Sequence, residues 1–373
     1  MTPTATAQHL LPTYARLGVT FVEGDGSWLV DAAGKRYLDC LGGIAVVSLG
    51  HRHPAPLAAA QAQLDRLWHV SNLFWTEPMQ ELASKLSDRF GGASAFFCNS
   101  GGEAVEAALK WARKSTGRPG FVALEGSFHG RTAGALSITG QPAKRTPFEP
   151  LLPGVRFTTP ATLADAVSDE TAAIVLEPVQ GEGGIHPLPA EMLARARELA
   201  DEHGALLVFD EVQTGVGRCG SFFAWEQLGV KPDAVTLAKG LANGLPIGAL
   251  LVSDDAPTGF EPGDHASTFG GNLVSSAAAC AVVDAIDDAL LAHGREVSAQ
   301  LAAALGPLGE VRGLGLLLGV ELDRPAGPVV EAALANGLVV GTAGERTLRL
   351  APPLTISSED AALAVELLTE AIA

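Results

Sequence analysis

The stretch AVTLAKGLANG, residues 234–244, decides the fold because an apolar strand in it ends in a single lysine. Val235 and Thr236 are β-branched and favour a buried strand, and the glycines that follow Lys239 allow a sharp turn. Ligands bind at the carboxyl edge of open α/β sheets, where a lysine withdrawn from water has a lowered pKa and is a better nucleophile. The alternative is a solvated lysine at the end of a strand. Taken alone, this short stretch favours that alternative, because most lysines are surface residues.

A second apolar run, ALLVFDE at residues 205–211, ends in Asp210. Residues 211–233 lie between the two runs, which is enough chain for the crossover that joins parallel strands. We therefore expect Asp210 and Lys239 at the same edge of one sheet. An imine-forming lysine beside an acid that keeps a pyridine nitrogen protonated is the protein's part of pyridoxal phosphate chemistry.

The composition is that of a globular protein with a large core. Of the 373 residues, 47% are hydrophobic and 18% are charged, which favours two domains. A net charge of −17 argues against a nucleic-acid partner. Because neither a secretory signal nor a membrane-length apolar stretch is visible, we expect a cytoplasmic protein without a membrane partner. The four cysteines are scattered without metal-site or disulfide spacing, and we expect no metal.

Strands alternate with helices through the middle of the chain, and this alternation predicts a doubly wound parallel sheet. Residues 21–40 have the pattern of a meander of short antiparallel strands. An alanine-rich helix is expected over residues 275–291. Beyond it, residues 315–321 and 347–350 are strand candidates, and residues 358–371 form an amphipathic helix.

Two further motifs lie where strands of this sheet are expected to end. In NSGGE, the residues Ser100, Gly101 and Gly102 would expose backbone N–H groups at a helix amino terminus, which is a phosphate site. Ordinary helix capping is the alternative. In FHGRT, Phe128 and Arg131 are placed at the same edge, with core packing and a surface ion pair as their alternatives.

Two other patterns point to different chemistry. GVGRCG, residues 215–220, matches the dinucleotide fingerprint, but no strand precedes it directly and no helix opens at Gly217. The alternative hypothesis, that the protein is a nicotinamide dehydrogenase, depends on this match alone. His51 and His53 suggest a metal site, but they have no second cluster of ligands and are more typical of hydrogen-bonding residues.

Six motifs, in this order, together resemble the class III aminotransferases, which are pyridoxal phosphate enzymes of fold type I. They are NSGGE (99–103), FHGRT (128–132), EPVQGE (177–182), DEVQTG (210–215), LAKG (237–240) and STFGGN (267–272). Two stretches, GGIAV at 42–46 and HVSNLF at 69–74, look most like the acetylornithine branch of the family. The chain departs from the family at Gly102, Val105 and Leu273, where alanine, asparagine and proline are usual; these positions affect packing.

The resemblance implies a fold-type I α/β transferase. Its large domain would hold a mainly parallel seven-stranded sheet flanked by helices, and a small α+β domain would be built from both chain ends. The implied boundaries place residues 1–45 in the small domain, residues 46–274 in the large cofactor-binding domain, and residues 275–373 in the small domain again.

The resemblance also assigns roles to individual residues. Lys239 would bind pyridoxal 5'-phosphate covalently, Asp210 would bind its ring nitrogen, and Gln213 its ring hydroxyl. Phe128 and Val212 would contact the two faces of the ring. The phosphate would be held by Ser100, Gly101 and Gly102, together with Thr268 from the second subunit of a homodimer with shared active sites.

Substrate binding is implied for five residues. Arg131 would hold the distal carboxylate, while Glu182 would cover Arg349 until an acceptor with an α-carboxylate arrives. Ile44 and Ser267 complete the set. The implied reaction transfers the δ-amino group of N2-acetyl-L-ornithine to 2-oxoglutarate, in arginine biosynthesis. Ornithine, succinylornithine, succinyl-diaminopimelate and 4-aminobutyrate remain alternative donors.

Overall fold

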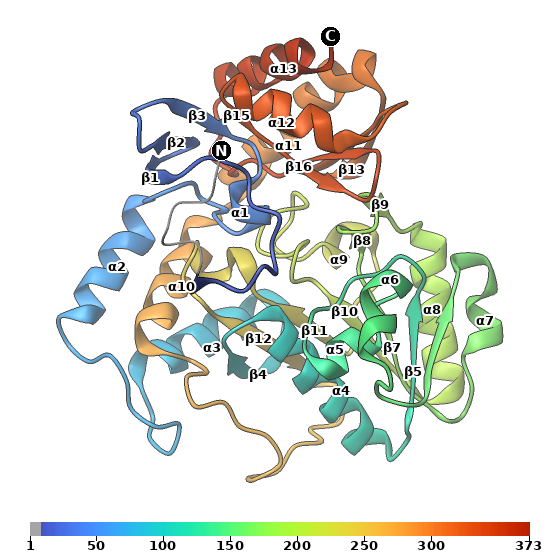
Figure 1. The fold of residues 1–373 in the computed structure, drawn as a ribbon. Helices are drawn as coiled ribbons and strands as arrows, with labels where there is room; N and C mark the ends of the chain where they lie inside the picture. Colours follow the sequence, from blue (N-terminus) through green and yellow to red (C-terminus); the bar gives the residue numbers. More distant parts are fainter. Residues whose placement is uncertain (1–8) are drawn as a thin grey trace.

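A seven-stranded sheet forms the centre of the larger part of the molecule (Figure 1). The structure is a computed structural model, and it describes residues 9–373. The strand order is β4-β12-β11-β10-β7-β5-β6. The bounds are β4 (Ala93–Cys98), β5 (Gly120–Leu124), β6 (Val155–Thr158), β7 (Thr171–Leu176), β10 (Leu206–Asp210), β11 (Ala234–Leu237) and β12 (Gly248–Ser253). Strands β6, β5, β7, β10 and β11 pair in parallel, whereas β12 runs antiparallel to β11 and β4. The predicted mainly parallel sheet is confirmed.

Alternate residues along each strand pack into different cores, because successive side chains point to opposite faces. In β10, Leu207 and Phe209 belong to one core, and Leu206 and Val208 belong to the other. The first core also contains helices α3 (Glu77–Phe90) and α8 (Ala190–His203), and the second contains α4 (Gly101–Thr116). Helices therefore cover both faces of the sheet, as the strand and helix alternation predicts.

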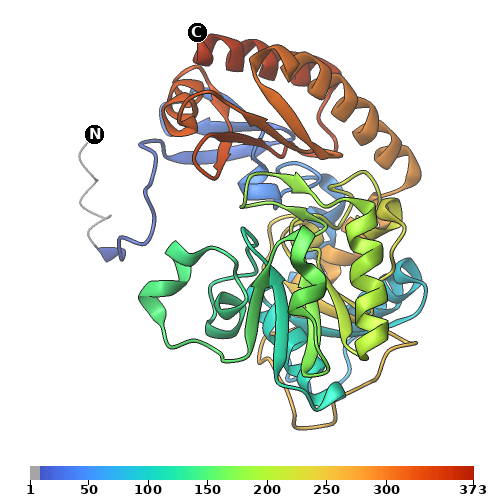
Figure 2. The same ribbon diagram turned by 90° about the vertical axis from the view of Figure 1, so that its right-hand side faces the viewer.

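The smaller part combines segments from both ends of the described chain, shown in blue and red in Figures 1 and 2. Leu38 in β3 pairs with Leu338 in β15, which joins the two ends in one sheet. This sheet contains β1 (Phe21–Asp25), β2 (Trp28–Asp31), β3 (Arg36–Asp39) and β15 (Leu338–Val339). A second sheet has β13 (Glu310–Leu314), β14 (Leu317–Glu321), β17 (Thr347–Leu350) and β16 (Gly341–Ala343). Helices α11 (Asp288–Leu305), α12 (Ala326–Ala335) and α13 (Ser358–Ile372) pack around them.

The structure corrects two element predictions. The helix expected over residues 275–291 is two helices, α10 (Leu273–Ala285) and α11, because the carboxylate of Asp287 accepts a hydrogen bond from the N–H of Leu290 and starts a new helix. The strand expected from residue 315 starts at Leu317. The crossover over residues 211–233 consists mostly of turns and contains only the short helix α9 (Trp225–Leu228).

Helix α10 packs against α2 (Pro54–Leu64) and α3, so it lies beside the large sheet. The expected domain boundary at residues 274 and 275 stays a prediction. The remaining helices and strands are short: α1 (Gly42–Ala45), α5 (Ala133–Ser137), α6 (Pro142–Arg145), α7 (Leu163–Ala166), β8 (Val179–Gln180) and β9 (His186–Pro187). Within residues 9–373, no helix has both the length and the apolar character that crossing a membrane requires.

Candidate active site

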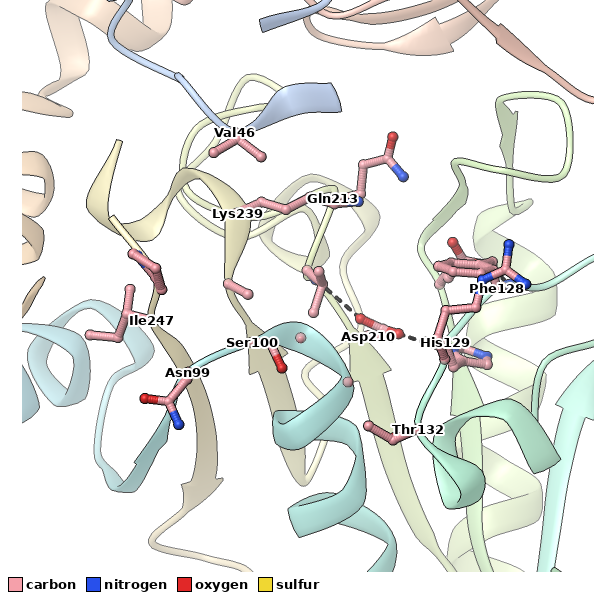
Figure 3. Close-up of a pocket in the computed structure, with 18 of the residues that line it drawn as sticks. Val46, Asn99, Ser100, Phe128, His129, Thr132, Asp210, Gln213, Lys239 and Ile247 are labelled. Carbon is pink, nitrogen blue, oxygen red and sulfur yellow. Dashed lines mark hydrogen bonds and ion pairs between the residues drawn. The ribbon is translucent and has the colours of Figure 1, made fainter. Parts of the chain in front are cut away.

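A cavity of about 440 Å³ lies at the carboxyl ends of β10 and β11. Figure 3 shows Lys239, Asp210 and Phe128 around it, with Ser100 at the start of α4. Its walls come from segments that are far apart in the sequence, and most of them follow strands of the sheet. The structure therefore brings together the motifs that the sequence placed at one sheet edge.

Lys239 begins the turn that follows β11, and its side chain lines the cavity. Its backbone has a φ of 41°, a left-handed conformation that is uncommon for a residue with a side chain and is found often at functional sites. Burial lowers the pKa of the amine to about 8, although the negative charge of Glu182 acts in the opposite direction. A neutral, nucleophilic amine is therefore accessible near physiological pH.

Asp210 ends β10 and lies directly beside Thr236 of β11 in the parallel register. Its Oδ1 atom accepts hydrogen bonds from the hydroxyl of Thr236 at 3.0 Å and from the N–H of Val212 at 3.1 Å. The side chain is only 4% exposed. The expected adjacency of the Asp210 and Lys239 strands is confirmed, and the carboxylate is held in one orientation.

His129 is the main site residue that the sequence analysis missed. Its Nδ1 atom lies 2.7 Å from Oδ2 of Asp210, and the ring is buried. Burial alone would lower the pKa of His129, but the hydrogen bond and the negative charges of Asp210 and Glu177 raise it above its ordinary value. The hydrogen bond from His129 also fixes the second oxygen of the Asp210 carboxylate. The only feature of the sequence that pointed to His129 was its position next to Phe128 in the FHGRT motif.

The amino terminus of α4 forms one wall of the cavity. The hydroxyl of Ser100 caps this helix by accepting a hydrogen bond from the N–H of Glu103 at 3.3 Å. Within the described residues, the N–H groups of Gly101 and Gly102 make no hydrogen bond and are available to an anion. A Cβ atom on Gly101 would lie 2.7 Å from Cγ1 of Val212, so glycine is required by this close approach.

Phe128, Val212 and Gln213 line the same cavity. The N–H of Phe128 donates to Oε2 of Glu177 at 2.8 Å, which fixes the start of the FHGRT segment. Glu177 is buried, and burial raises the pKa of its carboxyl to about 7. The contact with Glu177 therefore anchors the segment that carries the Phe128 ring at the wall of the cavity.

Arg349 and Glu182 form an ion pair between the small part and the large part of the molecule. Arg349 lies in β17, is 4% exposed, and also donates to Oε1 of Gln213 at 3.2 Å. Arg131 is exposed at the cavity, with Cζ 5.4 Å from the centre of the Phe128 ring. No hydrogen bond or ion pair within residues 9–373 involves the Arg131 side chain, so its guanidinium is free to bind a carboxylate.

The predicted residue Ile44 lies in an unusual turn. Residues 42–45 form α1 with φ between 59° and 67°, so this is one turn of left-handed helix. Such a turn is costly for L-residues and indicates strain held by the surroundings. Val46, which follows the turn, lines the cavity above Lys239, whereas Ile44 is 38% exposed and does not line it.

Ser267 and Thr268 lie outside the Lys239 cavity of their own chain. The hydroxyl of Ser267 accepts a hydrogen bond of 3.0 Å from Asn99, which does line it. Thr268 lines a separate hollow together with Phe74 and Trp75. The structure thus places Thr268 away from the other predicted phosphate ligands.

The patterns that pointed to other chemistry have structural explanations. Residues 215–220 lie in a series of turns, and the next helix is α9, which begins at Trp225. This is not the strand-to-helix turn that a dinucleotide fingerprint requires. His51 hydrogen-bonds with Asp39, with Nε2 and Oδ2 2.7 Å apart.

Comparisons with known proteins agree with this geometry. The profile of the family "Aminotransferase class-III" matches residues 12–372. The chain belongs to the class III aminotransferases. An acetylornithine aminotransferase from Corynebacterium efficiens is 47% identical over 100% of this chain and 97% of its own.

Solved structures of class III aminotransferases have the same fold. N-acetylornithine aminotransferase from Stenotrophomonas maltophilia is 36% identical, with a TM-score of 0.82 and 96% of each chain covered. An ornithine aminotransferase from Toxoplasma gondii, described with partial occupancy of PLP at its active site, is 31% identical with a TM-score of 0.92. That match covers 98% of this chain and 92% of the other. The predicted fold class is therefore confirmed.

Proposed function

We propose that this class III aminotransferase uses pyridoxal 5'-phosphate to transfer the δ-amino group of N2-acetyl-L-ornithine to 2-oxoglutarate. The products are N-acetyl-L-glutamate 5-semialdehyde and L-glutamate, in arginine biosynthesis. The observation that carries this proposal is the juxtaposition of the Lys239 amine with the fixed carboxylate of Asp210 in one cavity. The names of the relatives from C. efficiens and S. maltophilia support the choice of substrate.

The residues present fit pyridoxal phosphate. The unbonded N–H groups of Gly101 and Gly102, with the Ser100 hydroxyl, suit its phosphate. Phe128 and Val212 suit the two faces of its ring, and Gln213 suits its ring hydroxyl. Asp210 suits the ring nitrogen, and Lys239 the aldehyde. When bound, the cofactor withdraws electrons from the substrate carbon that carries the transferred amine.

The chain itself supplies charge and proton transfer. His129 holds the Asp210 carboxylate in one orientation through a hydrogen bond, so this carboxylate can stabilise a protonated ring nitrogen throughout the reaction. The amine of Lys239, once released by the incoming substrate, removes a proton from the amine-bearing carbon of the substrate. Its pKa of about 8 suits a group that must both accept and donate a proton near neutral pH.

Substrate orientation depends on two arginines. Arg131 binds the distal carboxylate of both substrates through its guanidinium. Arg349 binds the α-carboxylate of 2-oxoglutarate and of glutamate, and Glu182 neutralises Arg349 when the donor presents only a CH₂ group there. A permanent structural ion pair between Glu182 and Arg349 is the alternative.

The donor is acylated rather than free ornithine. Ile44 lies outside the cavity, so the choice of an acylated donor is supported by the names of the relatives from C. efficiens and S. maltophilia. An amine-donor panel with 2-oxoglutarate as the acceptor tests this directly. We expect the highest kcat/KM for N2-acetylornithine, above ornithine, succinylornithine, succinyl-diaminopimelate and 4-aminobutyrate. A higher kcat/KM for free ornithine would contradict the assignment.

A homodimer completes the site. Large apolar side chains are exposed around the segment that contains Thr268: Leu73 is 86% exposed, Trp75 82%, Trp68 66% and Phe74 62%. An apolar patch of this kind marks an interface, and a second copy of this chain would cover it and bring Thr268 to the phosphate. Sedimentation of the protein should give twice the mass of one chain, and Trp75→Glu should yield monomers with weakened cofactor binding.

The proposed compartment is the cytoplasm. All four cysteines are buried and unpaired, which suits a reducing environment.

A further inference from the structure

Lys144 is a half-buried cation beside the proposed active site, and none of the roles above uses it. It lies in α6, with Nζ 4.7 Å from the centre of the Phe128 ring. Within the described residues, its ammonium makes no hydrogen bond and no ion pair. Burial lowers the pKa of Lys144, the charge of Glu182 raises it, and the charges of Arg131 and Arg349 lower it. Lys144 is therefore in electrostatic contact with the proposed substrate-binding groups.

Packing holds α6 next to the segment that carries Glu182. The side chain of Gln141, which precedes α6, donates to the carbonyl of Gly126 at 3.0 Å. Gly183 packs against the same carbonyl, so closely that a Cβ atom there would lie 2.5 Å from the oxygen. Glu177 links the two sides again, because it accepts hydrogen bonds from the N–H groups of both Phe128 and Gly181. Gly181 and Gly183, the two neighbours of Glu182, are thus fixed beside residues 126–128. Lys144 contacts the ring of Phe128 in this segment.

The proposed function creates a need that Lys144 can meet. When the α-carboxylate of glutamate or 2-oxoglutarate binds Arg349, the Glu182 carboxylate must leave it. The Glu182 side chain is only 23% exposed, so leaving its charge unpaired there would be costly. Besides Arg349, the cations with the largest effect on the pKa of Glu182 are Lys239 and Lys144, both of which lower it. Lys239 is committed to the cofactor and to proton transfer, which leaves Lys144.

We propose that Lys144 is the second partner of Glu182, and that it holds this carboxylate whenever Arg349 is engaged by a substrate α-carboxylate. The inference rests on the proposed function, and it makes Lys144 a positioning residue for one half-reaction only. With acetylornithine, Glu182 stays on Arg349 and Lys144 is not needed. With glutamate, Glu182 moves from Arg349 to Lys144.

The test compares single-turnover rates for the two amino donors, acetylornithine and glutamate, in the holoenzyme. Lys144→Met removes the charge and keeps much of the chain length. We expect it to slow the glutamate half-reaction about fivefold, the effect of losing one partly buried charge pair, and to leave the acetylornithine half-reaction unchanged. Lys144→Arg should restore the glutamate rate. Lys231→Met is the matched control, because the Lys231 ammonium also lies over a phenylalanine ring, at 4.8 Å from Phe90.

A second comparison uses Glu182→Gln as the background. In Glu182→Gln the side chain has no negative charge that Lys144 could hold. The double variant Glu182→Gln/Lys144→Met should therefore react with glutamate at the same rate as Glu182→Gln alone. If Lys144→Met slows both donors equally, or still slows glutamate in the Glu182→Gln background, Lys144 binds substrate directly and the inference is wrong. An unchanged glutamate rate in Lys144→Met would also overturn it. Failure of the unsubstituted enzyme to react with glutamate would instead contradict the proposed function.

Discussion

His129 and Asp210 form a buried hydrogen bond of 2.7 Å behind the cavity that contains Lys239. With the Thr236 hydroxyl on the other carboxylate oxygen, this contact fixes the direction of the Asp210 carboxylate. The amine of Lys239 lines the same cavity and makes no hydrogen bond or ion pair within residues 9–373. The site therefore combines a carboxylate held in one orientation with an amine that no such contact holds within these residues.

Asp210→Asn should lower kcat/KM by about a thousandfold or more, because an amide cannot stabilise a protonated ring nitrogen. The fold should be retained, since asparagine can still accept from Thr236. His129→Gln should cost less, about tenfold, because the Asp210 carboxylate loses one hydrogen bond and keeps those from Thr236 and Val212. Steady-state kinetics with acetylornithine would measure both. A loss smaller than about tenfold in Asp210→Asn would count against the proposed role of Asp210.

Lys239→Ala should abolish multiple turnovers, because it removes both the covalent partner of the cofactor and the proton carrier. Cofactor can still bind through the amino terminus of α4 and Asp210. The purified parent should show a visible absorbance band that borohydride removes, and the variant should lack this reducible band. Turnover near the parent rate would refute the assignment, and Lys231→Ala should leave turnover and the band unchanged.

Cofactor uptake by the apoprotein should depend on pH. Below a pKa of about 8, Lys239 carries a proton and cannot attack an aldehyde; above it the amine is neutral. The rate of uptake should therefore rise with pH with a midpoint near pH 8 and then level off, whereas an ordinary lysine would give a midpoint near about pH 10. Stopped-flow recording of the visible band would show the profile, and an increase that continues through about pH 10 would contradict the lowered pKa.

Glu182→Ala should affect the two half-reactions in opposite directions. The loss of the carboxylate leaves Arg349 uncovered, so acetylornithine should react more slowly, while glutamate should become a better donor. Single-turnover rates with each donor would decide this. Equal slowing with both donors would instead identify the Glu182–Arg349 contact as a permanent structural ion pair.

The sequence was sufficient to predict the sheet and the adjacency of Asp210 and Lys239, because strand periodicity and crossover length are local properties. It was also sufficient to place Phe128 and the start of α4 at one edge, whereas Val212 and Gln213 were assigned by the family resemblance. These residues follow directly from strands or begin a helix, where position along the chain determines position in space.

Other features depend on contacts that local patterns do not contain. The role of His129 requires a partner 81 residues away. The left-handed turn at residues 42–45 includes Ile44, a β-branched residue that disfavours this conformation, so only the surrounding packing can impose it. The break between α10 and α11 depends on capping by Asp287, which competes with a continuous alanine-rich pattern.

The pairing of β3 with β15 also constrains when the protein can complete its fold during synthesis. Leu38 leaves the ribosome long before its partner Leu338 is made. At ordinary rates of translation the delay is about 15–60 s. During this time β3 and the strained turn that follows it lack the strand that stabilises them. The carboxyl-terminal segment therefore acts as a late closing step, and a nascent chain that stalls before residue 338 would expose an unpaired strand edge to aggregation.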